Sequence, residues 1–158
     1  MNLDYTTFYS EIENFYKLPE VIDTFQMGDR FQETWKKVFG CQEAKDALNV
    51  VYIWRTDKDI PRLKDLSNIV YIGKTKTSLY ERHYRYSEVE ATEEGNKLKY
   101  SHIIKEYGPI RITYMPFEKY GETLEKAEGR LLWWYFLNHL EYPPVNYSGT
   151  PYHNDVLS

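Results

Sequence analysis

Two tyrosines, one arginine and one glutamate are the residues of this 158-residue chain best suited to chemistry. Tyr52 lies in the apolar run VVYI and Tyr71, nineteen residues later, in IVYIG; Arg82 and Glu128 follow. A carboxylate can bind a divalent metal ion that stabilises charge, and a guanidinium can clamp a phosphate with its planar fork of donors. A tyrosine can take a proton from water if its pKa falls from about 10. These residue types together predict hydrolysis of a phosphodiester bond at a single-metal site.

Two predicted strands carry the tyrosines. Residues 49–55 and 68–73 are β-branched and aromatic, which favours strands. The charged segment 56–67 between them is predicted to be a loop, short enough to allow antiparallel pairing. In a suitable register Tyr52 and Tyr71 share one face of the sheet, although the sequence does not fix that register.

A short helix is predicted to present the arginine. The run SLYE, beginning at Ser78, has the form of a capping box and predicts a helix start. Leu79, Arg82, His83 and Tyr86 then fall on one helical face. Because Leu79 marks that face as inward, we expect Arg82 to point inward and meet an anion. The alternative is a salt-bridged or surface arginine, and His83 is assigned a structural role.

A long helix over residues 123–141 is predicted to present the glutamate. On an ideal helix Glu128 lies roughly 50° from the centre of the apolar stripe, and Glu125 about 110° away. Glu128 is therefore expected to face the interior, where a carboxylate must be paired, protonated or bound to metal. The stripe itself consists of Leu124, Ala127, Leu131, Tyr135 and Asn138.

The remaining patterns complete the expected organisation. Apolar spacing predicts helical structure in 5–25 and 29–47, so residues 1–47 form an N-terminal helical extension. The domain proper spans 48–158. Within it a further helix is expected at 97–107 and a third strand at 110–117.

The charge distribution gives only weak support for a nucleic-acid partner. The net charge is −4, and residues 1–48 hold nine acids against five bases, whereas 49–158 hold fifteen of each. Residues 74–105 carry seven Lys and Arg against five acids. This is a weakly basic stretch, so charge alone does not indicate a DNA-binding protein.

Cysteine content and hydropathy indicate a cytoplasmic protein. The single Cys41 rules out an intrachain disulfide and a cysteine metal cluster, and fits a reducing compartment. No run of 18 apolar residues exists and no signal sequence opens the chain, so no membrane association is expected. The 16 Tyr residues suit interfaces and sites, but many of them could simply line a core.

The motif YIGKT at 71–75 resembles the YIG element of the GIY-YIG nuclease family. Arg82, eleven residues after Tyr71, matches the family's arginine, and VVY ending at Tyr52 stands in place of Gly-Ile-Tyr. Glu128, preceded by Ala127 and followed by two leucines at 131–132, resembles the family's glutamate helix. The run PPVN, ending at Asn146, resembles its closing segment. The resemblance covers about residues 49–147.

This resemblance implies a fold and a set of roles. The fold would be α+β, a small three-stranded antiparallel sheet flanked by helices. Tyr52 would be the general base for water, supported by Tyr71, if Lys74, Arg82 and the metal lower its pKa. Arg82 would hold the scissile phosphate, and Glu128 would bind one Mg²⁺ or Mn²⁺.

Further residues receive supporting roles from the same resemblance. Tyr86 matches a position that is His or Tyr in restriction-type members, and Lys74 would assist with the phosphate or the phenol. Lys76, Arg85 and Asn146 would contact the nucleic acid.

The compact form resembles restriction enzymes and phage endonucleases, so the expected function is double-strand cleavage of DNA by a homodimer or tetramer. Two alternatives remain open. One is a non-catalytic module that binds nucleic acid or protein on the same scaffold, and the other is a structural or inhibitory protein whose tyrosines are core.

Overall fold

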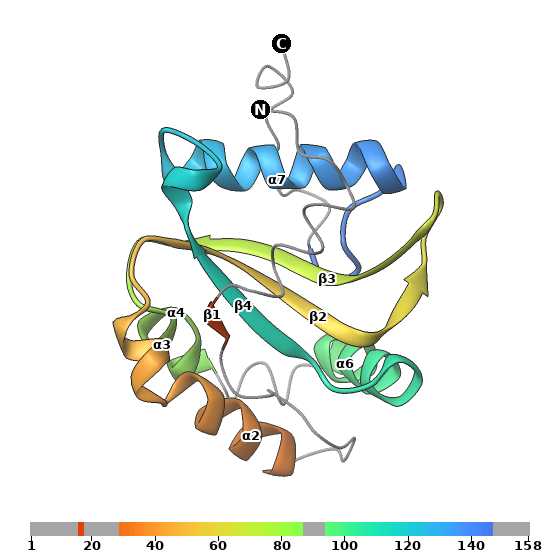
Figure 1. Cartoon of the computed structure of the whole chain (residues 1–158). Coiled ribbons are helices and arrows are strands. Elements are labelled where there is room, and N and C mark those ends of the chain that lie inside the picture. The colour runs from red at the N-terminus through yellow and green to blue at the C-terminus, as the bar shows by residue number, and fades with distance from the viewer. Residues whose placement is uncertain (1–15, 18–28, 87–93, 147–158) are drawn as a thin grey trace.

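The computed structural model describes residues 16–17, 29–86 and 94–146. Predictions for residues 1–15, 18–28, 87–93 and 147–158 lie outside this part. A twisted antiparallel sheet forms the middle layer, with α7 on one face and helices α2, α3, α4 and α6 on the other (Figure 1).

Three long strands make up the sheet, as expected for the α+β class. They are β2 (Val50–Pro61), β3 (Leu66–Thr75) and β4 (Arg111–Pro116), and the strand order is β1-β4-β2-β3. β2 pairs antiparallel with both β3 and β4. The two-residue β1 (Tyr16–Lys17) pairs with the outer edge of β4. The helix expected here is therefore wrong at these two residues, because the open edge of β4 offers their backbone a partner.

The β2–β3 hairpin is longer than predicted, and the expected loop over 56–67 is wrong. Both strands continue outward, past register shifts near Arg55, to a turn that Arg62 N–H closes by donating to Asp65 O at 3.0 Å. The charged side chains at 57–59 point to solvent, whereas Ile60 is buried. A charged segment thus forms a strand here because both of its faces are exposed to solvent at residues 57–59.

The helices lie close to their predicted positions. The helical stretch at 29–47 consists of α2 (Asp29–Phe39) and α3 (Gln42–Asp46). α4 (Leu79–His83) begins at the predicted cap, where Ser78 Oγ accepts from Glu81 N–H at 3.0 Å, and tightens into the 3₁₀ turn η1 (Tyr84–Tyr86). The last three elements are α6 (Glu94–Tyr107), the 3₁₀ turn η2 (Phe117–Lys119) and α7 (Leu124–His139).

Two apolar cores lie on opposite faces of the sheet because neighbouring residues of a strand point to opposite sides. On the side of α2 and α6 the core includes Trp35, Phe39 and Trp54. On the side of α7 it includes Ile53 and Leu131. In the part of the chain that the structure describes, no helix is long and apolar enough to cross a bilayer.

Candidate functional site

The two tyrosines lie on one face of the sheet, as predicted. Tyr52 pairs with Gly73 and Trp54 pairs with Tyr71, so the phenols sit diagonally on neighbouring strands. Their ring centroids are 5.8 Å apart and the rings are inclined by 28°. Such a near-stacked pair fixes the position of each phenol against the other.

Gly73 makes this pairing possible because both rings lie over its α-carbon. A Cβ at this position would come within 2.6 Å of Tyr52 Cζ and 2.6 Å of Tyr71 Cε1. Any larger residue would push the phenols apart. The glycine of the YIG motif is therefore needed here for close approach of side chains, not for backbone freedom.

Tyr52 is fully buried, and the protein groups around it do not lower its pKa. Burial raises the pKa of Tyr52 well above its ordinary value, and the neighbouring Tyr71 phenol raises it further, while Arg82 opposes the shift more weakly. Among the described residues no group lies in hydrogen-bonding geometry with the Tyr52 hydroxyl. Tyr52 is thus a protonated phenol at neutral pH, which cannot accept a proton from water. Tyr71, in contrast, is half-buried.

The arginine helix is turned differently from the prediction. Leu79 and His83 are buried, whereas Arg82 is exposed, so the expected inward orientation of Arg82 is wrong. α4 has only five residues before it tightens into the 3₁₀ turn η1. Its contacts with the core come from Leu79 and His83, which are four residues apart. Arg82 consequently lies on the flank of the helix.

His83 occupies the inward position instead. Its imidazole lies 4.5 Å from the Phe39 ring and 5.1 Å from the Tyr52 ring, in an edge-on arrangement at 86°. Burial, together with the neighbouring Arg82 charge, lowers the pKa of His83 to about 3. A neutral imidazole therefore packs against Tyr52 and helps to hold its ring.

Glu128 faces the interior, as its helical angle predicts. Glu128 is only 8% exposed, whereas Glu125 is exposed. Its Oε1 accepts a hydrogen bond from Lys74 Nζ at 3.2 Å, which joins α7 to β3. Burial raises the pKa of the Glu128 carboxyl, and the Lys74 charge counteracts that shift.

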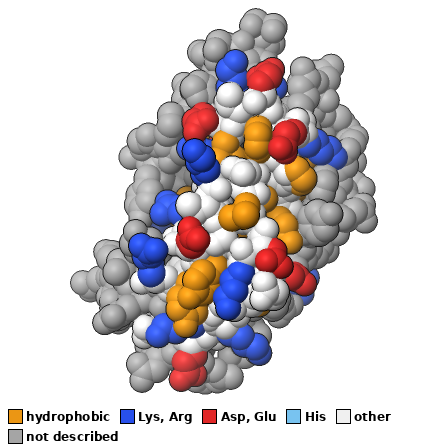
Figure 2. Space-filling model, turned by 90° about the vertical axis from the view of Figure 1, so that its left-hand side faces the viewer, with side chains coloured by type: hydrophobic (Ala, Val, Ile, Leu, Met, Phe, Trp, Pro, Cys, Tyr) orange, Lys and Arg blue, Asp and Glu red, His pale blue; other side chains and the backbone are white. Residues whose placement is uncertain are grey.

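A hollow of about 330 Å³ opens next to this ion pair. It lies where β3 ends, α4 begins and α7 begins, so it brings together Lys74, Lys76 and Arg82. Figure 2 faces the side of the molecule on which these elements meet, and Lys and Arg side chains there are interspersed with Asp and Glu. The complete lining of the hollow consists of Lys74, Thr75, Lys76, Thr77, Arg82, Leu124 and Glu125.

Three polar residues of the lining were not predicted from the sequence. Thr75 and Thr77 bring hydroxyl groups to the hollow, and the Thr75 hydroxyl donates to Thr77 O at 3.0 Å. Glu125 adds a second carboxylate. The polar run KTKTS between the second strand and the capping box was the available signal for the threonines. For Glu125 the relevant sequence feature is its position three residues before Glu128.

Asn146 has a structural role, so its assignment as a nucleic-acid contact is wrong. Its side chain is buried and bonds twice to Ile72: Oδ1 accepts from the backbone N–H at 3.0 Å, and Nδ2 donates to the carbonyl at 2.9 Å. Val145 N–H also donates to Val70 O at 2.9 Å. These contacts cover the outer edge of β3, which would otherwise leave polar backbone groups unpaired.

The other predicted contacts are outside the hollow lining or only partly described. Arg85 is exposed but is not among the residues that line the hollow. The backbone of Tyr86 lies in η1, and its side chain lies outside the described part.

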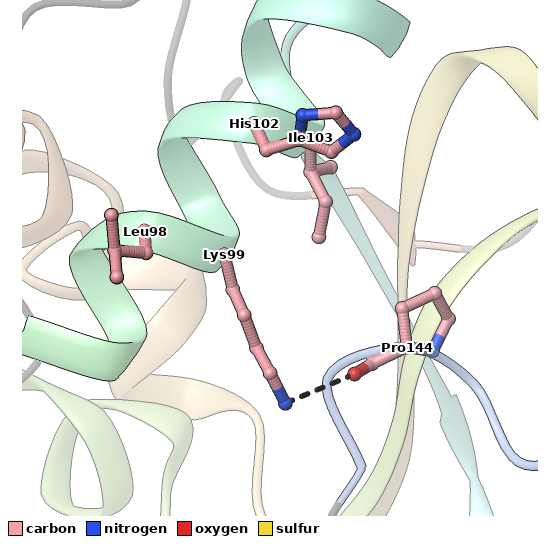
Figure 3. A pocket seen from close by; sticks show the side chains of 5 residues that line it. All are labelled: Leu98, Lys99, His102, Ile103 and Pro144. Atoms are coloured by element: carbon pink, nitrogen blue, oxygen red, sulfur yellow. Dashed lines mark hydrogen bonds between the residues drawn. The ribbon is translucent and has the colours of Figure 1, made fainter.

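A second hollow of about 350 Å³ lies between α6 and the segment after α7. Figure 3 shows Lys99 Nζ donating to Pro144 O, a distance of 3.4 Å, across its wall. Its lining is mostly apolar and contains none of the predicted site residues. We therefore place the candidate site at the Lys74–Glu128 pair.

Comparisons with known proteins add no further identification, since the chain matches no protein-family model, no curated protein and no solved structure. The GIY-YIG resemblance consequently remains a prediction.

Proposed function

We propose that this protein is a metal-dependent DNA endonuclease of the GIY-YIG type. The observation that supports it best is the buried Glu128 carboxylate, which is paired with Lys74 at 3.2 Å and is near enough for its charge to act on the Tyr52 phenol. Arg82 lines the adjoining hollow. A metal ligand, a phosphate clamp and a phenol are the groups that phosphodiester hydrolysis needs.

The donor chemistry at Glu128 fits Mg²⁺ or Mn²⁺. Carboxylate oxygens are the ligands that these hard cations prefer, and Mg²⁺ often takes only one or two of them, with water and substrate phosphate completing its shell. The Lys74 ammonium, 3.2 Å from Oε1, already occupies the place of a cation there. Bound metal would supply charge stabilisation at the phosphate and a water of lowered pKa.

The cations of the hollow would bind the substrate. Arg82 is exposed and could extend its fork of donors toward a phosphate. Lys76 adds a second positive charge from the loop before α4. Lys74, once displaced from Glu128, would stay within reach of the same phosphate.

We assign the proton transfer to Tyr71 in place of Tyr52. Tyr52 is sealed from solvent and has a raised pKa, so it would remain protonated and hold its neighbour in position. Tyr71 is half-buried, with its ring against Tyr52 and over Gly73. Of the two phenols it is the one that attacking water could reach.

Double-strand cleavage would require a second copy of the chain. One such site cuts one strand, so we retain a homodimer or tetramer in the proposal. DNA is the proposed substrate, and Lys76 and Arg85 are its proposed contacts outside the catalytic group.

A second candidate function is a non-catalytic module that binds nucleic acid or protein on this scaffold. The raised pKa of Tyr52 and the mixed charge of the site face favour it. Such a module would bind DNA in a salt-sensitive way that is independent of metal, and would cut no DNA in Mg²⁺ or Mn²⁺.

The deciding experiment is incubation of the protein with unmethylated supercoiled plasmid and Mg²⁺, with an EDTA control. Cleavage should require the metal, and Arg82→Ala should reduce its rate by about a hundredfold or more. Arg111→Ala is the matched control, since Arg111 is an exposed arginine bridged to Asp57. Absence of cutting in Mg²⁺ and Mn²⁺, or undiminished cutting by Arg82→Ala, contradicts the proposal. Discrete plasmid fragments would indicate a site-specific enzyme, whereas a continuous smear of fragments would indicate a degradative one.

A further inference from the structure

A pair of stacked tyrosines lies on the same short helix as Arg82. Tyr80 on α4 and Tyr84 on η1 have ring centroids 4.8 Å apart, and the rings are inclined by 27°. The Lys45 ammonium lies over the Tyr80 ring, 5.2 Å from its centroid. Lys45 belongs to α3, which lies beside α4 (Figure 1). Neither tyrosine lines the hollow, so the proposed function gives this pair no role.

The end of α2 holds the tyrosine pair in position. A Cβ at Gly40, the residue after α2, would come within 3.2 Å of Tyr84 Cε2, so the Tyr84 ring lies against this glycine. Tyr84 also packs on the apolar core of that side. Both tyrosines are nevertheless only half-buried. The rings are therefore ordered before any ligand arrives, which lowers the entropic cost of stacking a flat group on them.

Exposed cations lie on the elements around the pair. Lys45 comes from α3 and Arg85 from η1, and the last turn of α2 adds the lysines at 36–37. Exposed acids lie on α3 and α4 as well, namely Glu43, Asp46 and Glu81. The charge of this surface is therefore mixed, and its distinguishing feature is the pair of flat rings with an ammonium over one of them.

A simpler role for the tyrosine pair is stabilisation of a short helix. Side chains four residues apart on a helix contact each other and support it. That role needs only apolar contact, which leucine supplies about as well as tyrosine. Stacking of a nucleobase needs an aromatic face, which phenylalanine keeps and leucine lacks. The two roles therefore predict different responses to these two substitutions.

The position of the pair relative to Arg82 suits a single strand of nucleic acid. Residues 80 and 82 are about 200° apart on an ideal helix, so Tyr80 and Arg82 lie on opposite flanks of α4. The width of a helix with its side chains is about 10 Å, which corresponds to about three nucleotides at about 3.4 Å each. A strand with one phosphate at Arg82 could thus place a base on the tyrosines a few nucleotides away.

We infer that Tyr80 and Tyr84 form a stacking platform for an unpaired nucleotide of the DNA substrate. Proteins hold single strands by stacking bases on aromatic rings, because every base has a flat face, whereas the bases of an intact duplex cover one another. Lys45 would move from the Tyr80 ring to the phosphate of the stacked nucleotide. The inference rests on the proposed function for DNA as the ligand, but not for its cleavage.

Binding of a single strand in EDTA tests this without catalysis. Fluorescence anisotropy would measure the dissociation constant of a labelled oligothymidylate for the full chain and its variants. We expect Tyr80→Leu to raise it about tenfold, as for the loss of one stacked base, and Tyr80→Phe to leave it within about twofold. The rise should be smaller for a duplex of the same length. Circular dichroism and urea unfolding would confirm that each variant is folded.

A second stacked pair supplies the matched control. Phe136 stacks on Trp133 with ring centroids 5.6 Å apart, on α7 at the other face of the sheet. Phe136→Leu should therefore bind the strand like the wild type. Photocrosslinking of a strand that carries 5-iodouracil needs no substitution, and peptide mapping should place the attachment at Tyr80 or Tyr84.

Any of five results overturns the inference. They are no binding by the wild type, an unchanged constant in Tyr80→Leu, an equal rise in Tyr80→Phe or in Phe136→Leu, an equal rise with the duplex, and crosslinks only at other residues. Plasmid cleavage, measured in parallel, separates this inference from the proposed function. Wild-type cleavage with unchanged binding by Tyr80→Leu would leave the nuclease and remove the platform. Weakened binding by Tyr80→Leu, with no wild-type cleavage, would leave the platform and remove the nuclease.

Discussion

The two ends of α7 are joined to the β2–β3 hairpin in different ways. At the C-terminal end of α7, Arg62 Nη2 lies 2.9 Å from Glu141 Oε1, which also accepts from Leu63 N–H at 3.0 Å. Lys64 N–H donates to His139 O at 3.1 Å, and the His139 ring nitrogen Nδ1 bonds to Lys64 O at 3.0 Å. Backbone groups therefore hold this end of the hairpin.

At the N-terminal end of α7 a side-chain ion pair makes the link. Lys74 Nζ and Glu128 Oε1 are 3.2 Å apart, at the edge of an open hollow. A side-chain ammonium can be replaced by another cation without loss of backbone hydrogen bonds. The comparison suggests that one end of the hairpin anchors the fold, while the other can exchange its cation. Three changes follow in order of decreasing effect: two test the packing around Tyr52, and the last tests this difference between the two ends.

Gly73→Ala should have the largest effect on stability. The added Cβ would meet Tyr52 and Tyr71 at 2.6 Å, and a buried phenol cannot move without displacing its neighbours. Overpacking of this kind costs about 3 kcal/mol. Urea unfolding would measure the loss of free energy of unfolding. Ile72→Val on the same strand should cost only about 1 kcal/mol, and equal losses in the two variants would contradict the close approach at Gly73.

His83→Phe should change how stability depends on pH. The folded-state pKa of His83 is lowered to about 3, so between pH 6.5 and 3 the unfolded chain binds a proton that the folded chain does not. The wild type should therefore lose about 1.4 kcal/mol per pH unit as pH falls below 6.5 on account of this residue. Phenylalanine keeps the ring packing and removes that loss. Urea unfolding at pH 7.5, 6 and 5 would give the free energy of unfolding, which should change less steeply with pH in the variant than in the wild type. Equal slopes in the two proteins would refute this role of His83.

Glu141→Gln should have the smallest effect. Its bridge to Arg62 is partly exposed, and such pairs contribute about 0.5 kcal/mol. The amide oxygen can still accept from Leu63 N–H. The midpoint temperature of thermal unfolding should fall by only a few degrees, and the rate of plasmid cleavage should be unchanged. A loss of cleavage would show that the anchored end takes part in catalysis.

Local patterns in the sequence predicted the elements of the candidate site well. The Ser78 cap and the inward position of Glu128 follow from spacing within single helices, and both are present. The shared face of Tyr52 and Tyr71 follows from strand alternation once the register is known.

The errors concern contacts between distant segments. The burial that raises the pKa of Tyr52 comes in part from His83 on α4, which no local pattern reveals. The inward turn of His83 in place of Arg82 depends on how the short α4 packs against α2. Asn146 bonds to Ile72 because β3 is an edge strand, and strand order could not be read from the sequence.

The most direct test compares Mg²⁺-dependent plasmid cleavage by Glu128→Gln and Glu141→Gln, two isosteric changes at opposite ends of α7. Glutamine keeps the size of each side chain, so both variants should fold. A metal-dependent site at the Lys74–Glu128 pair predicts that Glu128→Gln cuts at least a hundredfold more slowly than the wild type, while Glu141→Gln cuts at the wild-type rate. Equal rates in the two variants, or wild-type cutting by Glu128→Gln, would contradict it.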